Sequence, residues 1–344
     1  MAEAHPMVSI VIPCRNERKH IGRCLDSILA NDYPRHRIEI IVADGMSDDG
    51  TRELLAEYAI RHPAVRVVPN PKGIASAALN IGITQATGEV IMRMDAHAEY
   101  PPNYVSALVG WLQRTGADNV GSAWITRPAS DGPVARAIAI ALSHPFGIGN
   151  ARFRLGTAEP RQVDTVPFGC FRKELFTRIG LFDEDLVRNQ DDEFNFRLLK
   201  AGGKVLLVPG VVAYYYARPS LRQLARMYYQ YGYFKPLVAR KTGGIVTLRQ
   251  LVPPLFVSGL IIAAVFAPWV AAARALLVLI LGTYLAANVA CSAAAIFRSG
   301  VRVGVVLPAA FTVPHVSYGL GFLRGILDFL ILRRPVRTPV PLSR

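Results

Sequence analysis

The chain has 344 residues, of which 51% are hydrophobic, and its formal net charge at pH 7 is +14. The length allows one sizeable soluble domain with an appendage, while the positive mean hydropathy excludes an ordinary soluble enzyme. The charge indicates contact with an anionic membrane surface rather than nucleic acid, because the arginines after residue 250 flank uncharged apolar segments.

The N-terminal part of the chain alternates short apolar runs with segments of helical periodicity. Strands are predicted at residues 8–13, 38–43, 65–69 and 90–94, and helices at residues 18–30, 51–61 and 73–86. This order predicts an α/β fold with a parallel sheet and helices on both faces.

The pattern is mixed between residues 119 and 216. Strands are predicted at residues 119–126 and 205–216, helices at 136–143, 173–179 and 191–201, and a loop at 144–154. Residues 220–238 then form a basic, tyrosine-rich amphipathic pattern. Such a helix suits the lipid headgroup layer, and it could equally pack on its own domain.

Three apolar segments follow, each about long enough to cross a bilayer, which takes roughly 20 residues. Residues 251–273 and 275–297 are separated by Arg274 alone, which predicts a tight hairpin with both basic flanks in the cytoplasm. Residues 303–332 contain Pro308 and Pro314, which we expect to interrupt the segment because proline breaks or kinks helices. We expect that segment to be re-entrant, because a full crossing would export the basic tail at 333–344.

These patterns together define the expected domain organisation and location. The expected parts are a catalytic domain at 1–217, an interface helix and linker at 218–250, a membrane region at 251–332 and a basic tail at 333–344. The four cysteines lack metal or redox spacing, and the first apolar run is too short for a signal peptide. We therefore expect the first domain to lie in the cytoplasm.

Asp95 and His97 stand two residues apart at the end of the fourth predicted strand. Open α/β sheets bind ligands at the carboxyl ends of their strands. The spacing lets a carboxylate and an imidazole reach one divalent ion, which can neutralise a diphosphate. The sequence therefore predicts a metal site at this position.

Polar residues also follow the other predicted strands. Carboxylates at this edge can hydrogen-bond a uracil N–H and ribose hydroxyls, so we expect a nucleotide-sugar site there. The candidate residues are Pro13, Arg15, Glu17, Asp44, Ser47, Lys72, Gly73 and Asp95. The neighbouring Asp48 and Asp49 could instead serve only as a helix cap and turn.

Asp191 opens a predicted helix. A helix N-terminus stabilises a carboxylate, so we expect Asp191 to be ionised and able to take a proton from an acceptor hydroxyl. Asp192 and Glu193 are alternative bases, and Glu193 could instead pair with Arg197 one turn further on. A capping role without a catalytic task also stays open.

Further residues are candidates for contacts with the acceptor or the diphosphate, since guanidinium groups bind phosphate oxygens bidentately. They are Arg152, Arg154, Gln190, Asp192, Gln223 and Arg226. As alternatives, Arg226 could face the membrane, and the two arginines of the predicted loop could be simply solvated.

Together these motifs resemble those of family 2 glycosyltransferases with the GT-A fold. The matching features are Val-Ile-Pro13 with Asn16-Glu17, the turn from Asp44 to Thr51, Asp95-Ala-His97, residues 164–184, and Gln190-Asp191 before Arg197. The Asp-Ala-His motif and the runs 144–154 and 315–321 resemble one branch, the succinoglycan-biosynthesis-type glucosyltransferases. That branch carries a C-terminal membrane region.

The resemblance implies a role for each matching residue. Glu17 and Asp44 would bind the uridine, Asp95 and His97 would hold Mg²⁺ or Mn²⁺, and Asp191 would be the base. The usual metal motif ends in Asp, so His97 is a departure that favours Mn²⁺. Met227 replaces the tryptophan of processive synthases, which argues against polymer threading.

The resemblance implies a GT-A domain with a mixed, mostly parallel sheet, followed by transmembrane helices. The expected activity is inverting, metal-dependent transfer of one hexose, with UDP-glucose favoured, to a polyprenyl-pyrophosphate-linked saccharide at the cytoplasmic face of a bacterial inner membrane. The expected partners are the UDP-sugar, the lipid-linked glycan and the bilayer, without nucleic acid. Two alternatives are a polyprenyl-phosphate glycosyltransferase and a non-catalytic membrane module that binds nucleotide-sugar.

Overall fold

The computed structural model describes residues 5–244 and 247–336. The chain divides into two compact units. The first contains residues 1–125 and 152–215, and the second contains residues 126–151 and those from 216 onward. Residues 126–151, expected within a catalytic domain at 1–217, therefore pack with the C-terminal region.

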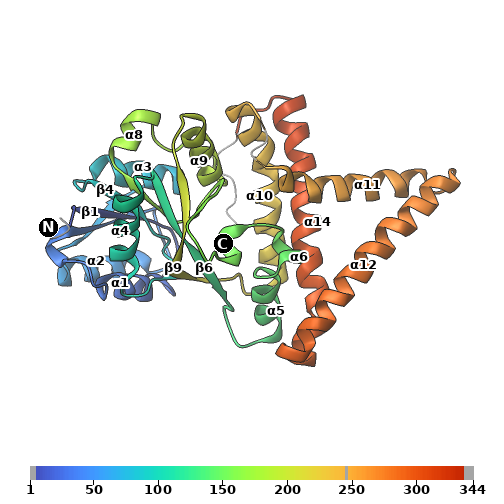
Figure 1. Cartoon of the computed structure of the whole chain (residues 1–344), viewed down its shortest axis with the longest axis horizontal. Helices are drawn as coiled ribbons and strands as arrows, with labels where there is room; N and C mark the ends of the chain where they lie inside the picture. Colours follow the sequence, from blue (N-terminus) through green and yellow to red (C-terminus); the bar gives the residue numbers. More distant parts are fainter. Residues whose placement is uncertain (1–4, 245–246, 337–344) are drawn as a thin grey trace. The chain divides into compact units, whose positions relative to one another are not determined.

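Four parallel strands form one half of the sheet in the first unit, in the order β3-β2-β1-β4 (Figure 1). They are β1 (Val8–Cys14), β2 (Ile38–Asp44), β3 (Val65–Pro69) and β4 (Val90–Arg93). The helical segments between them are α1 (Ile21–Leu29), η1 (Arg35–Arg37), α2 (Thr51–Arg61) and α3 (Ala75–Gln85). The alternation predicted for this part of the chain is confirmed.

Antiparallel strands form the other half, so the sheet is mixed as predicted. They are β5 (Ala98–Glu99), β6 (Asn119–Arg127), β7 (Arg161–Gln162), β8 (Gly169–Arg172) and β9 (Val205–Tyr216). β8 inserts between β4 and β6 and pairs antiparallel with both. The remaining helices of the unit are α4 (Tyr104–Thr115), α7 (Arg152–Leu155), α8 (Glu174–Ile179) and α9 (Gln190–Lys200). The sequence patterns predicted neither α4 nor β8.

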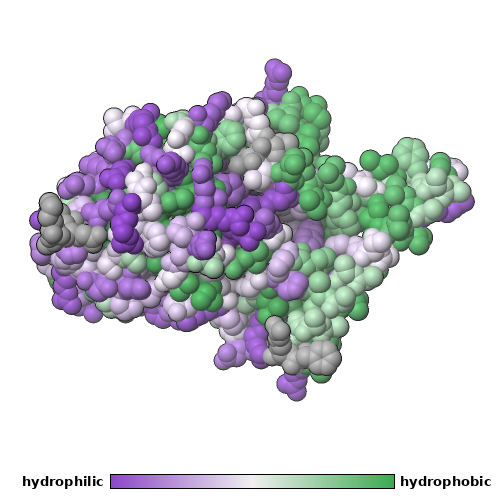
Figure 2. Space-filling model, in the orientation of Figure 1, coloured by the Kyte–Doolittle hydropathy of each residue, from purple (hydrophilic) through white to green (hydrophobic). Residues whose placement is uncertain are grey.

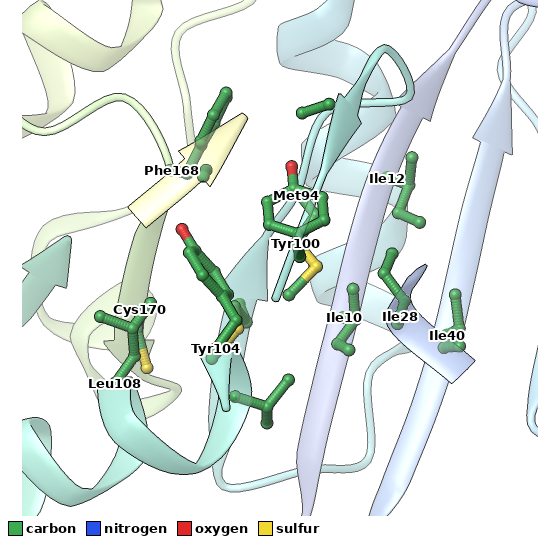
Figure 3. Close-up of a cluster of buried hydrophobic side chains, with 14 of the residues drawn as sticks. Ile10, Ile12, Ile28, Ile40, Met94, Tyr100, Tyr104, Leu108, Phe168 and Cys170 are labelled. Atoms are coloured by element: carbon green, nitrogen blue, oxygen red, sulfur yellow. The ribbon is translucent and has the colours of Figure 1, made fainter. Parts of the chain in front are cut away.

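Both faces of the sheet are buried, which explains why the central strands are apolar throughout. On β1, Ile10 and Ile12 point into one cluster, and Val11 points into the cluster on the opposite face. Figure 3 shows the first cluster, where the β1 isoleucines lie near Met94 and Tyr104. This packing on both faces fixes the strand ends that carry the polar residues.

The second unit is helical apart from its strand ends and loops. Its segments are α5 (Pro133–Ala141), α6 (Pro145–Ile148), α10 (Leu221–Thr242), η2 (Leu248–Leu251), α11 (Val252–Phe266), α12 (Ala271–Ser299), α13 (Val301–Gly304), α14 (Leu307–Gly325) and η3 (Ile326–Ile331). Residues 144–154 were expected to be a loop, and this is wrong in part, because α6 and α7 each form one short helical turn there. Proline at the first turn of α6 favours that turn.

Within the described residues, three helical stretches are long and apolar enough to cross a membrane, namely Leu248–Phe266, Ala271–Ile296 and Val301–Ile331. Figure 2 shows the apolar surface of α11 and α12. The turn between these helices lies at residues 267–270. Arg274 lies inside α12 and donates to the Ala267 carbonyl at 3.1 Å, so the expectation that Arg274 alone separates the two spans is wrong, because the break lies before it.

The third apolar segment is interrupted once, at residues 305–306 between α13 and α14. Pro308 follows this break in the first turn of α14, where its missing N–H costs nothing, whereas Pro314 lies inside the helix. The expectation that the prolines interrupt the segment therefore agrees with the break before Pro308 and is wrong for Pro314. The basic tail begins within the described residues, but its part from residue 337 onward lies outside them.

Candidate active site

The candidate residues of the first unit gather where the parallel strands end. Cys14 pairs with Asp44 in the β1–β2 ladder, and Val11 pairs with Arg93 in the β1–β4 ladder. Pro13 is buried inside β1. Because these strands run in the same direction, the loops that follow them emerge at the same edge of the sheet.

Asp44 holds the loops after β1 and β2 together. Its side chain is buried and accepts hydrogen bonds from the Ser47 backbone N–H at 3.1 Å and from Ser47 Oγ at 2.5 Å. Ser47 Oγ in turn accepts a bond from the Asn16 backbone N–H at 2.8 Å. Asn16 and Met46 adopt left-handed backbone conformations, with φ of 55° and 59°. These contacts give the loops a fixed shape, and contact of Asp44 and Ser47 with a nucleotide stays a prediction.

Arg15 joins the first loop to the third. Its Nη1 donates to the Gly73 carbonyl at 3.2 Å. Gly73 has a φ of 64°, and a Cβ at that residue would lie 2.5 Å from Arg15 Nη1. The left-handed backbone favours glycine here, while the guanidinium is the flexible end of its side chain and could shift to make room for a Cβ.

Lys72, next to Gly73, forms an ion pair with Glu184. The Lys72 side chain is 67% exposed and the Glu184 side chain 32%. The hydrogen bond to Glu184 raises the pKa of Lys72 above its ordinary value. The positive charge is therefore retained at this edge, and its approach to a nucleotide stays a prediction.

Arg93 is a central residue of the site that the sequence patterns did not identify. Its side chain is 7% exposed and pairs with both Asp95, at 3.2 Å, and Asp191. The signal was present in the sequence, because an arginine inside the apolar run of β4 must find a partner once it is buried. Arg93 therefore brings together two carboxylates that lie almost 100 residues apart in the sequence.

Asp95 and His97 have different neighbours. Asp95 is directed to Arg93, and its backbone N–H donates to Tyr100 OH at 2.7 Å. His97 is buried, with Nδ1 at 3.2 Å from Glu17 Oε1 and its ring edge-on to Tyr215. Among the residues that the structure describes, no group of three or more His, Cys, Asp or Glu side chains is arranged to hold a metal ion. A cation here would need ligands from its substrate as well.

Asp191 lies in the first turn of α9, as its sequence context predicted. Asn189 precedes the helix with a left-handed φ of 62°, and Gln190 is buried. Asp192 is half-buried. Glu193 is buried and pairs with Arg197 at 2.8 Å, which confirms the pairing considered for it. Glu193 is thereby committed to a structural contact, which leaves Asp191 and Asp192 as candidates for the base.

The candidate acceptor residues are divided between the two units. In the first unit, the Arg154 guanidinium lies 4.4 Å from the centre of the Trp124 ring, a cation–π contact, and Arg152 is half-buried on the same short helix. In the second unit, the Gln223 backbone N–H donates to the capping Ser220 hydroxyl, and Arg226 is exposed on α10. Their contacts with an acceptor or diphosphate stay predictions.

The family model described as "Glycosyl transferase family 2" matches residues 9–180, half of the chain, including the loops after β1, β2 and β4. The chain belongs to glycosyl transferase family 2. It is also 32% identical over 324 residues to the succinoglycan biosynthesis protein ExoA of Rhizobium meliloti (strain 1021), covering 93% of this chain and 95% of that protein.

Two further proteins extend this membership. A dolichyl N-acetyl-alpha-D-glucosaminyl phosphate 3-beta-D-2,3-diacetamido-2,3-dideoxy-beta-D-glucuronosyltransferase of Methanococcus voltae is 30% identical, covering 68% of this family 2 chain and 74% of its own. The mannosyltransferase PcManGT from Pyrobaculum calidifontis, solved with GDP-Man and Mn²⁺, is 23% identical with a TM-score of 0.57, covering 91% of this chain and 88% of its own. The structural likeness supports the GT-A fold.

Proposed function

We propose that this glycosyltransferase transfers a single hexose from a UDP-sugar, with UDP-glucose favoured, to a polyprenyl-pyrophosphate-linked saccharide, with inversion. One observation carries the proposal: Arg93 contacts both Asp95, the residue expected to hold the metal ion in the nucleotide-sugar site, and Asp191, the residue expected to act as base. Binding of the leaving diphosphate and removal of the acceptor proton would then take place side by side at the carboxyl edge of the sheet. A mere nucleotide-binding module has no need of a base at that point.

Asp191 would be the base. Its position in the first turn of α9 and the guanidinium beside it both favour the ionised carboxylate that proton removal requires. Once deprotonated, the acceptor hydroxyl attacks the anomeric carbon opposite the leaving diphosphate, which inverts the configuration and converts an α-linked donor into a β-linked product. Arg93 holds the carboxylate in place during this step.

The residues present fit a divalent cation. Asp95 offers a carboxylate that is 20% exposed, and His97 offers an imidazole, which together form a mixed oxygen and nitrogen donor set that suits Mn²⁺ better than Mg²⁺. Diphosphate oxygens and water would supply the other ligands. When bound, the cation would neutralise negative charge on the departing UDP.

The candidate membrane helices support a lipid-linked acceptor. The exposed apolar helices α11 and α12 could anchor the chain in a bilayer, and the arginines that flank them favour a cytoplasmic catalytic domain on the inner membrane. The 32% identical relative has a name that refers to succinoglycan biosynthesis. A saccharide on a polyprenyl carrier is the acceptor class that joins these two observations.

The test is a donor screen on membranes that contain lipid-linked acceptors, with the mass of the product as readout. We expect UDP-glucose or UDP-galactose to be used, and Asp191→Asn to lower transfer by about 10²–10⁴-fold while UDP binding is retained. Asp192→Asn, one residue further on the same helical turn, tests the other candidate base and should retain more activity than Asp191→Asn if Asp191 takes the proton.

Three other outcomes would change the assignment. Full turnover by Asp191→Asn would move the base to another residue. A product on polyprenyl phosphate alone would favour the lipid-linked monosaccharide alternative. Tight UDP binding without any release of UDP from a UDP-sugar would favour the non-catalytic module.

A further inference from the structure

We propose that the C-terminal end of α14 binds the headgroup phosphate of an anionic phospholipid. The guanidinium groups of Arg324 and Arg334 hold the phosphate, and buried Asp328 keeps both groups in place. This inference goes beyond the proposed transfer reaction, because it depends on neither the sugar donor nor the acceptor. All three residues belong to the second unit, and none is among the candidate residues of the active site.

Asp328 is a buried carboxylate with three hydrogen-bond donors around it. Its Oδ2 accepts from Arg324 Nε at 2.9 Å and from the Tyr233 hydroxyl at 3.1 Å, and its Oδ1 accepts from Arg334 Nη1 at 3.0 Å. A buried charge requires partners of this kind, because water does not reach it. Since Tyr233 belongs to α10, the same carboxylate fastens the two arginines to the neighbouring helix.

The positive charge around Asp328 exceeds what this carboxylate needs. Asp328 is the only acidic residue of the sequence after position 216, where fifteen lysines and arginines occur. One cation would neutralise it, but two contact it, and Arg240 of α10 donates to the carbonyl of the adjacent Phe329 at 2.8 Å. Three guanidinium groups and one carboxylate leave this cluster with a net charge of +2, which attracts an anion.

The backbone after α14 is shaped to bring Arg334 back to Asp328. Residues Ile326–Ile331 form a π-helical turn, a rare conformation that is frequent at functional sites. Arg333 then adopts a left-handed conformation with a φ of 48°, which a residue with a side chain seldom takes. The Arg334 backbone N–H donates to the Asp328 carbonyl at 2.8 Å. The position of the Arg334 side chain is therefore set by the fold.

Both arginine side chains remain accessible while Asp328 holds them. They are 47% and 53% exposed. A guanidinium carries five N–H donors, so each arginine can bind a second acceptor without releasing the carboxylate. Phosphate oxygens match this fork geometry and accept charge-assisted hydrogen bonds from it. The cluster is therefore suited to a phosphate group at the protein surface.

The apolar neighbours of Arg324 indicate that this phosphate belongs to a lipid. Leu320, Arg324 and Leu327 follow one another at helical spacings of four and three residues, which places them on one face, and both leucines are exposed. Acyl chains can cover these leucines while the headgroup reaches the guanidinium, whereas inorganic phosphate gains nothing from them. The excess positive charge repels the ammonium of a zwitterionic headgroup and so favours an anionic lipid.

The experiment measures binding of defined lipids to the purified full-length protein in a neutral detergent, by native mass spectrometry. The probes are dioleoylphosphatidylglycerol, which is anionic, and dioleoylphosphatidylcholine, which has the same acyl chains and a zwitterionic headgroup. We expect the wild type to bind phosphatidylglycerol more tightly. Arg324→Gln with Arg334→Gln should lower that affinity about 30-fold, since two arginines beside an anionic headgroup are lost. The affinity for phosphatidylcholine should change little.

Two matched variants separate a built site from general attraction. Arg222→Gln with Arg302→Gln removes the same charge from exposed residues elsewhere in the second unit, and should lower phosphatidylglycerol affinity by less than about 3-fold. Arg324→Lys with Arg334→Lys keeps both charges near Asp328 but removes the fork, and should lower it roughly 3–10-fold. Thermal unfolding checks that each variant is folded, and the lysine variant decides the result if the glutamine variant is not.

Four outcomes would overturn the inference. Equal losses in the Arg324 and Arg222 pairs of variants would mean diffuse attraction, and equal affinity of the wild type for both lipids would mean no headgroup recognition. Displacement of phosphatidylglycerol by millimolar inorganic phosphate would mean a site for the free anion. Tighter binding of farnesyl diphosphate than of phosphatidylglycerol would assign the cluster to an isoprenoid diphosphate. Each of these results leaves the transferase proposal intact, because the donor screen does not involve this cluster.

Discussion

Replacing Arg93 by methionine tests the arrangement at the sheet edge most directly. Methionine keeps a long side chain in the space that Arg93 fills but removes the positive charge that faces Asp95 and Asp191. The two carboxylates would then face each other across an apolar side chain. We expect both the stability of the protein and the rate of transfer to fall.

The size of the effect on stability follows from the burial of the three side chains. Removing one partner of a buried ion pair costs about 3–5 kcal/mol. Asp95 and Asp191 are 20% and 24% exposed, so water compensates part of the lost contact and we expect about 2–3 kcal/mol. In a domain of this size 1 kcal/mol lowers Tm by about 2–4 °C, which gives a loss of roughly 4–12 °C.

The assay is thermal unfolding of the purified full-length protein in detergent, followed by transfer kinetics at a temperature where every variant is folded. Arg66→Met is the matched control, because Arg66 pairs with Glu39 at 3.6 Å but is 48% exposed. It should cost less than about 1 kcal/mol. The double variant Arg93→Met with Asp191→Asn should regain part of the stability, since one of the two repelling charges is gone.

Transfer should fall about 100-fold in Arg93→Met, because a base displaced by about 1 Å loses its alignment with the acceptor hydroxyl. UDP affinity should change far less than the rate. The reasoning is refuted if Arg93→Met melts at the wild-type temperature, since the guanidinium would then make no net contribution at the site. A stability loss that Asp191→Asn does not reduce would assign the effect to packing instead of charge.

Three further predictions concern other parts of the chain. Burial raises the pKa of Glu39, but hydrogen bonds from neighbouring hydroxyl and amide groups and a nearby guanidinium outweigh it and lower the pKa overall. Glu39→Gln should therefore lower Tm at about pH 7. The difference in Tm between variant and wild type should shrink as the pH falls below about 4, because protonation of the Glu39 carboxylate removes the same stabilisation from the wild type. Gly321→Ala should lower Tm by several degrees, because the added Cβ would collide with the Tyr229 carbonyl of α10 and overpacking costs about 1–3 kcal/mol; an unchanged Tm would contradict this close packing. The third prediction concerns topology and uses a chain with Cys291→Ala. A membrane-impermeant thiol reagent applied to intact cells should label Trp269→Cys, in the turn between α11 and α12, but should label Arg334→Cys only after permeabilisation. Labelling of both variants in intact cells would place the C-terminal region outside.

Local patterns predicted the parallel half of the sheet because each element there is specified by its own residues. The strands β1 to β4 are apolar runs bounded by polar turns, and α2 begins at the residue that the pattern gave. β8 has only four residues and depends on antiparallel partners that precede it in the chain. Its existence is determined by long-range pairing, which a local pattern does not contain.

The helix α4 is a different case, because its signal was present. Tyr104, Leu108 and Leu112 recur at helical spacing and are all buried. Gly116 ends the helix in a left-handed conformation, which is the usual stop signal. The sequence of this segment therefore contains enough information to specify a helix.

In the candidate site, the sequence predicted the type and position of the functional residues but not the residues that they contact. The types of Asp95 and Asp191 and their positions at a strand end and a helix start were readable from the sequence. Their joint contact with Arg93 was not, because the direction in which a side chain turns depends on the packing of elements distant in the chain. The enclosure of His97 by Glu17 has the same cause.

The packing of α14 decides how far its apolar sequence can be taken as a membrane span. In the most apolar 18-residue window of the stretch Val301–Ile331, which includes α14, 44% is buried within the protein, against 17% and 11% in the corresponding windows of the two hairpin stretches. Gly321 and Gly325 bring its backbone against Tyr229 and Tyr233 of α10 (Figure 1), the close approach that small residues permit.

The neighbour α10 is the element that limits α14. It carries five cationic side chains, Arg222, Arg226, Lys235, Arg240 and Lys241, and each charge at a bilayer centre costs about 2.5–3.5 kcal/mol. α10 therefore belongs at the headgroup level, and the C-terminal half of α14, which lies against it, belongs there too. Buried Asp328 pairs with Arg324 and Arg334 at the same end, so this end is built from charges that hydrocarbon would not accept. We therefore expect only α11 and α12 to cross the bilayer fully, which leaves the C-terminal arginines on the side of α10, as the positive-inside rule requires.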